Sequence, residues 1–515
     1  MKKIIIDGGN LTPEDVRAIA YEKAPVALSE KAGANIQKAR AVIEKAVREH
    51  RTIYGVNTGF GKLSDVHISD DKILDLQINL LRSHSAGVGN PIPEEWVRAI
   101  MGIKINSLAR GFSGVRLKLV QLLADMLNRG VHPVVPEKGS VGASGDLVPL
   151  AHLSIVLIGQ GEAVFNGKRL PGAKALSEAG LEPIRLQAKE GISLINGTQF
   201  MAGLGALALL RAENLAQNAD IIGAMSAEAM LGSDVPFDPR IQEVRGLQGQ
   251  KISAANLAAF MKGSEIRESH RGCSRVQDAY SLRCMPQVHG AAREALAYGR
   301  HIISTEINAV TDNPLVFPES GDVLSGGNFH GEAIAMALDM LAIAAAELAN
   351  ISERRIASLM DSNMSELPPF IAYVPGLHSG FMIAQVTAAA LVSENKVLAY
   401  PSSVDSVPTS ANQEDHVSMG SIAARNALSI VENTENVLAI EALCAAQGID
   451  LRRPLQPGRG TMAAFHTLRK NIPRLQEDRP LAPEIGRAAE MIRAGEFTKA
   501  VQSFMNNSQS IKIGV

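Results

Sequence analysis

The chain has few aromatic residues and almost no net charge. Aromatic side chains make up 4% of its 515 residues, so its apolar mass comes from Ala, Leu, Ile and Val, a composition that favours closely packed helices. Its 51 basic and 53 acidic residues give a formal charge of −2, which supplies no diffuse attraction to nucleic acid or to an anionic membrane. We therefore expect a small molecule or another copy of the chain as its partner.

Cysteines and long apolar runs are also scarce. The three cysteines have no metal-ligand spacing and are too few for a disulfide framework in so long a chain. Near the N-terminus, the apolar run Ile4–Ile6 is too short for a signal peptide. The longest apolar stretches, residues 334–348 and 382–392, are interrupted by polar residues such as Asp339 and Gln385, so neither is expected to cross a membrane unaided. These absences predict a soluble, cytoplasmic protein.

Hydrophobic periodicity divides the chain into two regions. Up to about residue 200, short helical patterns alternate with loops rich in Gly and Pro, and long Ala-rich helical patterns follow. The long patterns cover residues 203–229, 332–360, 380–398 and 422–446. Only short runs, such as residues 2–6 and 163–170, resemble strands. We predict a mainly α protein, with a loop-rich region over residues 1–200 and a long-helix bundle with C-terminal helices over residues 201–515.

The long helices carry apolar residues on more than one face, which a single chain has difficulty covering. We therefore expect the bundle to form the core of an oligomer, and an elongated monomer with a thick core is the alternative.

Fragments of nucleotide-binding and metal-binding motifs also occur. Gly203, Gly205 and Ala208 match a GxGxxA pattern, but they begin an Ala/Leu-rich helix outside any βαβ unit, which favours helix packing over a dinucleotide site. The segments NFHGE (residues 328–332) and QEDHV (residues 413–417) lack the HExxH spacing of a zinc-binding helix. No metal site is expected.

The most unusual segment is GSVGASGDLVPLAHL, residues 139–153. A tight glycine-rich turn that leads into a helix is one interpretation. The other is a backbone cyclisation, because Gly145 presents an unhindered amide nitrogen that a strained turn could press onto the carbonyl carbon of Ala143. Loss of the Ser144 hydroxyl would then leave an exocyclic alkene, an electrophile made by the protein itself. Composition alone leaves both interpretations open.

This segment resembles the cofactor-forming loop of the aromatic amino acid ammonia-lyases, in which Ala-Ser-Gly becomes 4-methylidene-imidazol-5-one (MIO). Similar blocks follow in order along nearly the whole chain: YGVNTGFG, LRSHSAGVG, SLINGTQ, QDAYSLRC, SGGNFH, SERRI and TSANQEDHVSM. The resemblance implies a fumarase/aspartase-like helical fold and a homotetramer in which several chains contribute to each active site. It also implies that the loop-rich region carries the active site and that no external cofactor is needed.

Within the family, the motifs are most similar to members selective for histidine. This implies a carbon–nitrogen lyase that removes ammonia from L-histidine to give trans-urocanate, the first step of histidine degradation. The alternatives are a phenylalanine or tyrosine ammonia-lyase, an aminomutase of the same family or, more remotely, a non-catalytic helical scaffold.

The resemblance assigns catalytic roles to residues that match its motifs. The cofactor would form from Ala143, Ser144 and Gly145, and Asp146 would assist the cyclisation, although a helix N-cap explains Asp146 equally well from sequence. Tyr280 would be the general base, and residue Tyr54 would assist elimination. A tyrosine acts as a base only where positive charge or hydrogen bonds lower its pKa.

Substrate-binding roles follow in the same way. Arg283 would hold the substrate carboxylate with Gln277 nearby, Asn196 would contact cofactor and substrate, and Phe329 would pack beside the cofactor. Without the resemblance, the sequence would favour a surface cation at Arg283, a turn residue at Asn196 and a hydrophobic core residue at Phe329.

Substrate choice would rest on Ser83, His84 and Glu414. Together they make a polar wall suited to an imidazole ring, which has a donor and an acceptor nitrogen. A phenyl ring would leave these groups unpaired, and this mismatch penalises phenylalanine.

Overall fold

The computed structural model describes residues 3–273 and 275–506, so the predicted strand residue Lys2 lies outside the described part. The chain forms two compact units. The first contains residues 1–208, 300–339 and 401–425, and the second contains residues 209–299, 340–400 and 426–515. Each unit is therefore assembled from segments that are far apart in the sequence, whereas the predicted division at residue 200 separates continuous regions by sequence character.

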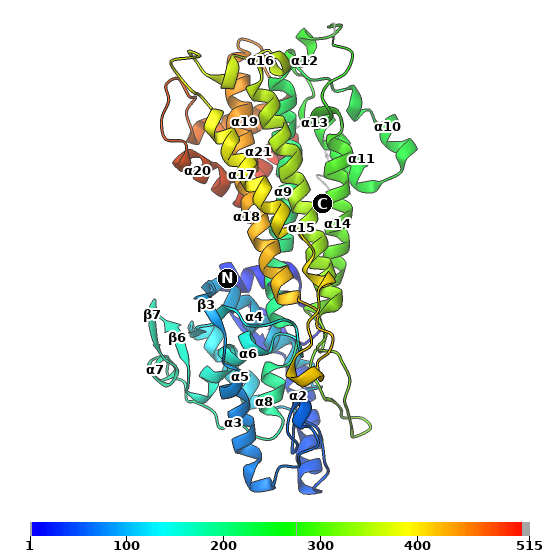
Figure 1. Cartoon of the computed structure of the whole chain (residues 1–515), viewed down its shortest axis with the longest axis vertical. Helices are drawn as coiled ribbons and strands as arrows, with labels where there is room; N and C mark the ends of the chain where they lie inside the picture. Colours follow the sequence, from blue (N-terminus) through cyan, green and yellow to red (C-terminus); the bar gives the residue numbers. More distant parts are fainter. Residues whose placement is uncertain (1–2, 274, 507–515) are drawn as a thin grey trace. The chain divides into compact units, whose positions relative to one another are not determined.

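The first unit combines short helices with small sheets (Figure 1). Its helices are α1 (Pro13–Tyr21), α2 (Glu30–Arg48), α3 (Ile73–His84), α4 (Glu94–Ala109), α5 (Leu117–Arg129), α6 (Leu147–Ser154), α7 (Gly172–Glu178) and α8 (Glu190–Ile195). Every residue of α4 from Val97 to Ala109 is buried, and α1 and α5 pack against it. A Cβ on Gly102 of α4 would lie 3.1 Å from Ile19 of α1, so glycine at this position permits the close helix contact.

The strands of the first unit are short and form separate sheets. Strand β1 (Ile4–Ile6) pairs in parallel with β2 (Val26–Leu28). Antiparallel pairs join β3 (Val88–Pro91) to β5 (Pro136–Lys138), β4 (His132–Pro133) to β6 (Glu162–Phe165), β6 to β7 (Lys168–Pro171), and β8 (Leu315–Phe317) to β9 (Asp322–Leu324). The run 163–170, predicted as a strand, is a hairpin, because Asn166 and Gly167 take φ values of 49° and 72° and turn the chain back.

Long helices dominate the rest of the chain. Four of the five boundaries between the units fall inside helices: α9 (Gln199–Ala229), α14 (Met285–Glu306), α15 (Glu332–Met360) and α18 (Gly420–Leu451). The second unit adds α10 (Pro239–Arg245), α11 (Gln248–Phe260), α12 (Glu265–Ser269), α13 (Tyr280–Arg283), α16 (Ser362–Ser365), α17 (Met382–Leu398), α19 (Arg459–Asn471), α20 (Ala482–Arg493) and α21 (Glu496–Asn506). Helices α9, α15, α17 and α18 therefore confirm the four long helical patterns in the sequence.

Buried charged groups join the long helices within the second unit. Glu441 of α18 accepts hydrogen bonds from Arg355 of α15 (2.5 Å) and from Ser226 of α9 (2.6 Å). Asp220 of α9 accepts one from Arg293 of α14 (2.7 Å). All these side chains are buried, and a buried charge is tolerated only where it is paired and hydrogen-bonded in this way.

The GxGxxA pattern lies inside α9, as the helix-packing interpretation requires. A Cβ on Gly203 would lie 3.2 Å from Ile100, and one on Gly205 would lie 2.9 Å from Leu338. Both glycines therefore serve close packing of helices.

Helix α15 is long and apolar enough to cross a membrane by length and composition. However, 67% of its most apolar window is buried inside the structure, as in the core helix of a globular protein.

Candidate active site

The predicted cyclisation segment forms a tight turn in the first unit. Ser144 has a φ of 50°, and Gly142 and Gly145 have φ values of 90° and 79°. The N–H of Gly145 donates to the carbonyl of Gly142 (3.1 Å), which closes the turn. A Cβ on Gly145 would lie 2.2 Å from the carbonyl oxygen of Gly197, so only glycine fits there. A left-handed serine between two left-handed glycines is a strained arrangement.

Asp146, the residue after the turn, is fixed by hydrogen bonds of its carboxylate. It occupies the position before α6, but its side chain does not cap that helix. Instead, one carboxylate oxygen accepts from the backbone N–H groups of Phe200 and Met201 (2.9 and 3.0 Å) at the start of α9, and the other accepts from Ser421 (3.1 Å). Burial raises the pKa of Asp146 to about 7, although these hydrogen bonds oppose the shift. The residue therefore carries an exchangeable proton near neutral pH.

Asn196 follows α8 and faces the same turn. Its side-chain N–H donates to the carbonyl of Asn313 (2.8 Å), whereas its Oδ1 is buried without a hydrogen-bond partner among the described residues. The ammonium of Lys104 donates to its backbone carbonyl (2.7 Å), and burial lowers the pKa of Lys104 to about 7. An unpaired buried acceptor is costly, so Oδ1 is suited to receive a donor from a bound molecule.

Two cavities meet at the turn. The larger cavity, about 770 Å³, has Ser144, Tyr54, His84 and Asn196 in its wall. The smaller cavity, about 410 Å³, is also lined by Ser144, Tyr54 and Asn196, together with Phe329. Most of the residues that the sequence assigned to this site therefore line one or both cavities: Ala143, Ser144, Tyr54, Ser83, His84, Asn196, Phe329 and Glu414.

Tyr54 lies in the loop after α2 and faces both cavities. Its hydroxyl oxygen accepts from the N–H of Gly61 (3.1 Å), and its ring meets Phe60 edge-on. Burial raises the pKa of Tyr54, and the nearby Glu414 raises it further, against the opposing effect of the Gly61 hydrogen bond. Tyr54 is therefore a neutral proton donor at neutral pH.

His84 ends α3 and is held by that helix. Its Nδ1 lies 2.9 Å from the carbonyl oxygen of Leu80 and 3.0 Å from the hydroxyl of Ser83. Because a carbonyl only accepts, Nδ1 carries the proton and Nε2 keeps a free lone pair. Burial lowers the pKa of His84, which keeps the ring neutral.

Glu414 reaches the site from a loop of unusual backbone. Ser410, Ala411 and Asn412 have φ values of 50°, 56° and 65°, and the N–H of Thr409 donates to the carbonyl of Glu414 (2.9 Å). The Oε2 atom of Glu414 is buried and has no hydrogen-bond partner in the described chain. It is a second free acceptor in the wall of both cavities.

The remaining predicted residues belong to the second unit. Gln277 and Arg283 line a separate cavity of about 500 Å³. The Arg283 guanidinium lies 4.3 Å from the ring centre of Tyr280, whose side chain is 72% exposed. The Nε of Arg283 is buried without a partner among the described residues. The structure of one chain therefore does not place these three residues among those that line the two cavities at Ser144.

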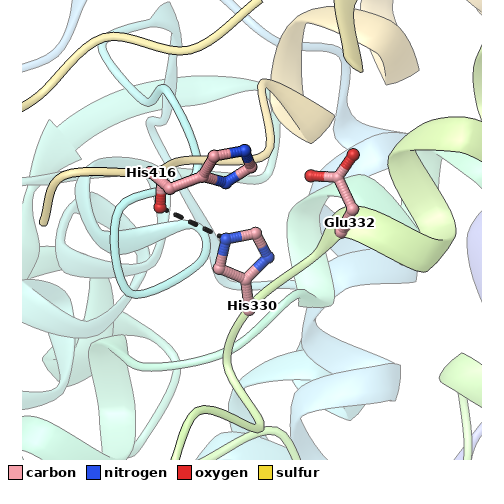
Figure 2. A group of neighbouring side chains, drawn as sticks. All are labelled: His330, Glu332 and His416. Carbon is pink, nitrogen blue, oxygen red and sulfur yellow. Dashed lines mark hydrogen bonds between the residues drawn. The ribbon is translucent and has the colours of Figure 1, made fainter. Parts of the chain in front are cut away.

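The structure also brings together a group that spacing arguments missed. His330, Glu332 and His416 come from the two segments that lacked a metal-binding spacing, yet their ligating atoms lie within 4.8 Å of one another (Figure 2). His330 and His416 are 86 positions apart, so no local motif could have revealed the pair.

Comparison with known proteins is consistent with this geometry. Residues 11–470 match the aromatic amino acid lyase family. The chain belongs to this family. It is 53% identical over 504 residues to a histidine ammonia-lyase of Anaeromyxobacter sp. (strain K), covering 96% of this chain and 99% of that protein.

Two solved structures of aromatic amino acid lyase relatives show the same fold. The histidine ammonia-lyase of Trypanosoma cruzi is 46% identical, with a TM-score of 0.91 and coverage of 98% of this chain and 96% of that one. A tyrosine aminomutase of Streptomyces globisporus is 39% identical, with a TM-score of 0.93 and full coverage of both chains. The expectation of a mainly helical, fumarase/aspartase-like fold is confirmed.

Proposed function

We propose that this aromatic amino acid lyase is a histidine ammonia-lyase, which eliminates ammonia from L-histidine to give trans-urocanate. The proposal is supported by the full-length similarity to histidine ammonia-lyases and by the wall of the larger cavity, which Ser144 also lines. That wall carries the neutral His84, with a free acceptor nitrogen, and the unpaired Oε2 of Glu414. This combination of acceptors is the observation that carries the assignment, because an imidazole N–H pairs with it and a phenyl ring does not.

The turn at residues 143–145 fits the MIO group that the family implies. The positive φ of Ser144 and the crowding around Gly145 match a segment folded back upon itself, and Asp146 stands beside it with a pKa of about 7. When formed, the group supplies an electrophilic carbon for the substrate amine. Asp146 would hold and release the proton that dehydration of the turn requires, and the free Oδ1 of Asn196 accepts an N–H from the substrate amine.

The remaining catalytic and substrate-binding roles are assigned to Tyr54, Tyr280, Arg283, Gln277 and Phe329. Tyr54, kept neutral by burial, donates a proton or hydrogen bond in the cavity. Tyr280 takes the β-proton, and Arg283 binds the substrate carboxylate with its unpaired Nε and its neighbouring N–H groups. Gln277 adds a polar contact to the carboxylate, and Phe329 packs beside the cofactor.

We further propose that the enzyme works as a cytoplasmic homotetramer. Its exposed large hydrophobic residues include Tyr280 and an apolar stripe on α17, where Ile383, Val386 and Val397 are 64%, 52% and 74% exposed. An apolar stripe of this kind is typical of a surface covered by another subunit. Tyr280 would then complete the active site of a neighbouring chain.

A product assay on the purified full-length protein tests the function. Histidine, phenylalanine and tyrosine are supplied in parallel, and products are identified by chromatography and by the near-ultraviolet absorbance of urocanate. We expect urocanate and ammonia in equal amounts. Faster formation of cinnamate, coumarate or a β-amino acid would favour the phenylalanine- or tyrosine-specific enzymes, or an aminomutase such as the similar one from S. globisporus.

The cofactor is tested in the same preparation. Intact-protein mass should lie two water molecules below the mass of the open chain, and Ser144→Ala should remove that deficit and lower kcat at least about 10³-fold. The exposed Ser177 on α7 is the matched control, because Ser177→Ala should change neither readout. An open chain in fully active protein would refute the electrophile.

A further inference from the structure

A group of potential metal ligands lies at the edge of the smaller cavity, outside the roles proposed above. His330 immediately precedes α15, Glu332 is the first residue of that helix, and His416 lies in the loop before α18. One nitrogen from each histidine and one oxygen of Glu332 lie within 4.8 Å of one another. Figure 2 shows the three side chains converging from these two segments.

The hydrogen bonding of His330 leaves one nitrogen free for a ligand. Its Nε2 lies 3.2 Å from the backbone carbonyl of His416, and a carbonyl only accepts, so Nε2 carries the proton. The lone pair is then on Nδ1, which Figure 2 shows on the side of the ring that faces Glu332. Histidines that bind metals typically donate their second ring N–H to a carbonyl in this way, which fixes the tautomer and the ring orientation.

Glu332 supplies the negative charge. Its Oε2 is buried and has no hydrogen-bond partner among the described residues. A buried carboxylate oxygen without a donor is costly, and no ion pair of Glu332 with a lysine or arginine is found in the described chain. A cation between Glu332 and the two histidines would remove this cost.

We propose that His330, Glu332 and His416 form a binding site for a divalent cation of the zinc class. Two imidazoles and one carboxylate are a donor set that zinc accepts, with water in the fourth position. Ligand atoms about 2.0–2.2 Å from such an ion are about 3.4 Å apart. The ligand atoms, now within 4.8 Å of one another, would have to move to this spacing through side-chain rotations, and His416 is the exposed member of the group.

The ion would join two segments that line the smaller cavity. His330 follows Phe329, and His416 follows Glu414 and Asp415, which all belong to the wall of that cavity. Binding would therefore tie the Glu414 loop to the start of α15. This site stands on its own geometry and does not depend on the proposed lyase reaction.

Metal titration of the full-length protein tests the site. The protein is freed of metal, and Zn²⁺ binding is measured by equilibrium dialysis and Co²⁺ binding by its visible absorption. The background is Cys273→Ser, because this exposed thiol would compete for the ion. We expect one ion per chain with a dissociation constant on the order of micromolar or lower, and a Co²⁺ spectrum typical of tetrahedral nitrogen and oxygen ligands.

Variants identify the ligands. His416→Ala and Glu332→Gln should each weaken binding at least about tenfold. The matched control is His50→Ala, which removes a surface histidine that also lies beside a carboxylate, 2.9 Å from Asp70, but belongs to no three-ligand group among the described residues. Binding that is unchanged in both ligand variants, or lost in the His50 variant, would overturn the proposal.

A readout on the unmutated protein covers the case in which a variant does not fold. Diethyl pyrocarbonate modifies accessible imidazoles, and peptide mapping by mass spectrometry locates the modified residues. Saturating Zn²⁺ should protect His330 and His416 and leave His50 as reactive as before. Protection of His84 in their place, or no protection, would contradict the assignment.

Discussion

At the residue scale, the proposed substrate preference can be tested at His84, the last residue of α3. The Leu80 carbonyl fixes its Nδ1 proton, so Nε2 faces the cavity as an acceptor. In His84→Leu, the substrate imidazole N–H loses this partner, and an unpaired polar group costs about 1–3 kcal/mol. We expect kcat/KM for histidine to fall about 10- to 100-fold and kcat/KM for phenylalanine to rise. Steady-state kinetics with both amino acids measures the change.

His301→Leu is the control for this substitution, since His301 is an exposed histidine of α14 with no proposed contact to substrate. If His84→Leu lowered kcat/KM for both amino acids equally, the residue would have a structural role and no part in specificity.

Asp146 predicts a pH dependence of stability with a definite sign. Its pKa is about 7 in the folded chain, against the ordinary 3.8, so between these values the folded state binds a proton that the unfolded state lacks. Stability from this group is complete below about pH 4 and is lost as pH rises through 7, by about 1.4 kcal/mol per unit at most. Asp146→Asn cannot ionise, and its amide preserves the acceptor for Phe200 and Met201.

We therefore expect the melting temperature of Asp146→Asn, relative to the unmutated protein, to increase steadily from pH 5 to pH 7. Differential scanning calorimetry at pH 5, 6 and 7 measures this difference. A constant difference would mean that Asp146 keeps an ordinary pKa in the folded protein.

Most of the site residues predicted from the sequence line the two cavities at Ser144, but the contacts that assemble them in space were not predicted. Ser144, Tyr54 and Asn196 lie in continuous motifs, which made them recognisable. For Asp146, position alone suggested a cap of the helix that follows, whereas its carboxylate binds the start of α9, more than fifty residues further along the chain. The cluster around His330 was missed for the same reason: tertiary contacts, and not local spacing, assemble it.

At the element scale, α8 positions Asn196, and the stability of this helix depends on Glu190, its first residue. This carboxylate is fully buried and accepts from the side chain of Arg116 at 2.6 and 2.8 Å and from the backbone N–H of Gln187 at 2.7 Å. In Glu190→Gln, an amide N–H would face these donors, and breaking a buried ion pair costs about 3–5 kcal/mol. We expect a loss of that size in urea unfolding and, because α8 ends at Asn196, lower activity.

Glu178→Gln serves as the control. Glu178 pairs with Lys174 at 3.9 Å on the exposed face of α7, where a pair contributes about 0.5 kcal/mol or less. Similar losses in the two variants would contradict the role given to Glu190.

Helices were the elements best predicted from sequence, because their apolar periodicity is set locally. The pattern over residues 332–360 coincides with α15, and the pattern over 422–446 lies within α18. Loops were less predictable. Residues 410–412 adopt a left-handed backbone without any glycine, so composition gives no sign of the turn that presents Glu414.

At the scale of the whole molecule, the cavities and Tyr280 belong to different units of the chain. Residues of the first unit line both cavities at Ser144, whereas Tyr280 and Arg283 belong to the second. Tyr280 is exposed, as expected of a residue that acts in the site of another subunit. The sharing of each active site between residues of different chains is therefore the feature of the proposed tetramer that most needs a test.

Oligomers assembled from two different inactive variants provide this test. Ser144→Ala and Tyr280→Phe should each be almost inactive alone. If each site combines Ser144 of one chain with Tyr280 of another, random co-assembly of the two variants in equal amounts should restore about a quarter of the wild-type activity. Tandem affinity tags isolate the mixed species, and urocanate formation measures the activity.

The control co-expresses the unmutated chain with a chain that carries both substitutions. Shared sites then leave about a quarter of the sites intact, whereas sites contained within one chain leave about half. The two mixtures therefore give equal activity only if the sites are shared. Activity that is absent from the first mixture and halved in the second would place Tyr280 in the same site as Ser144 of its own chain.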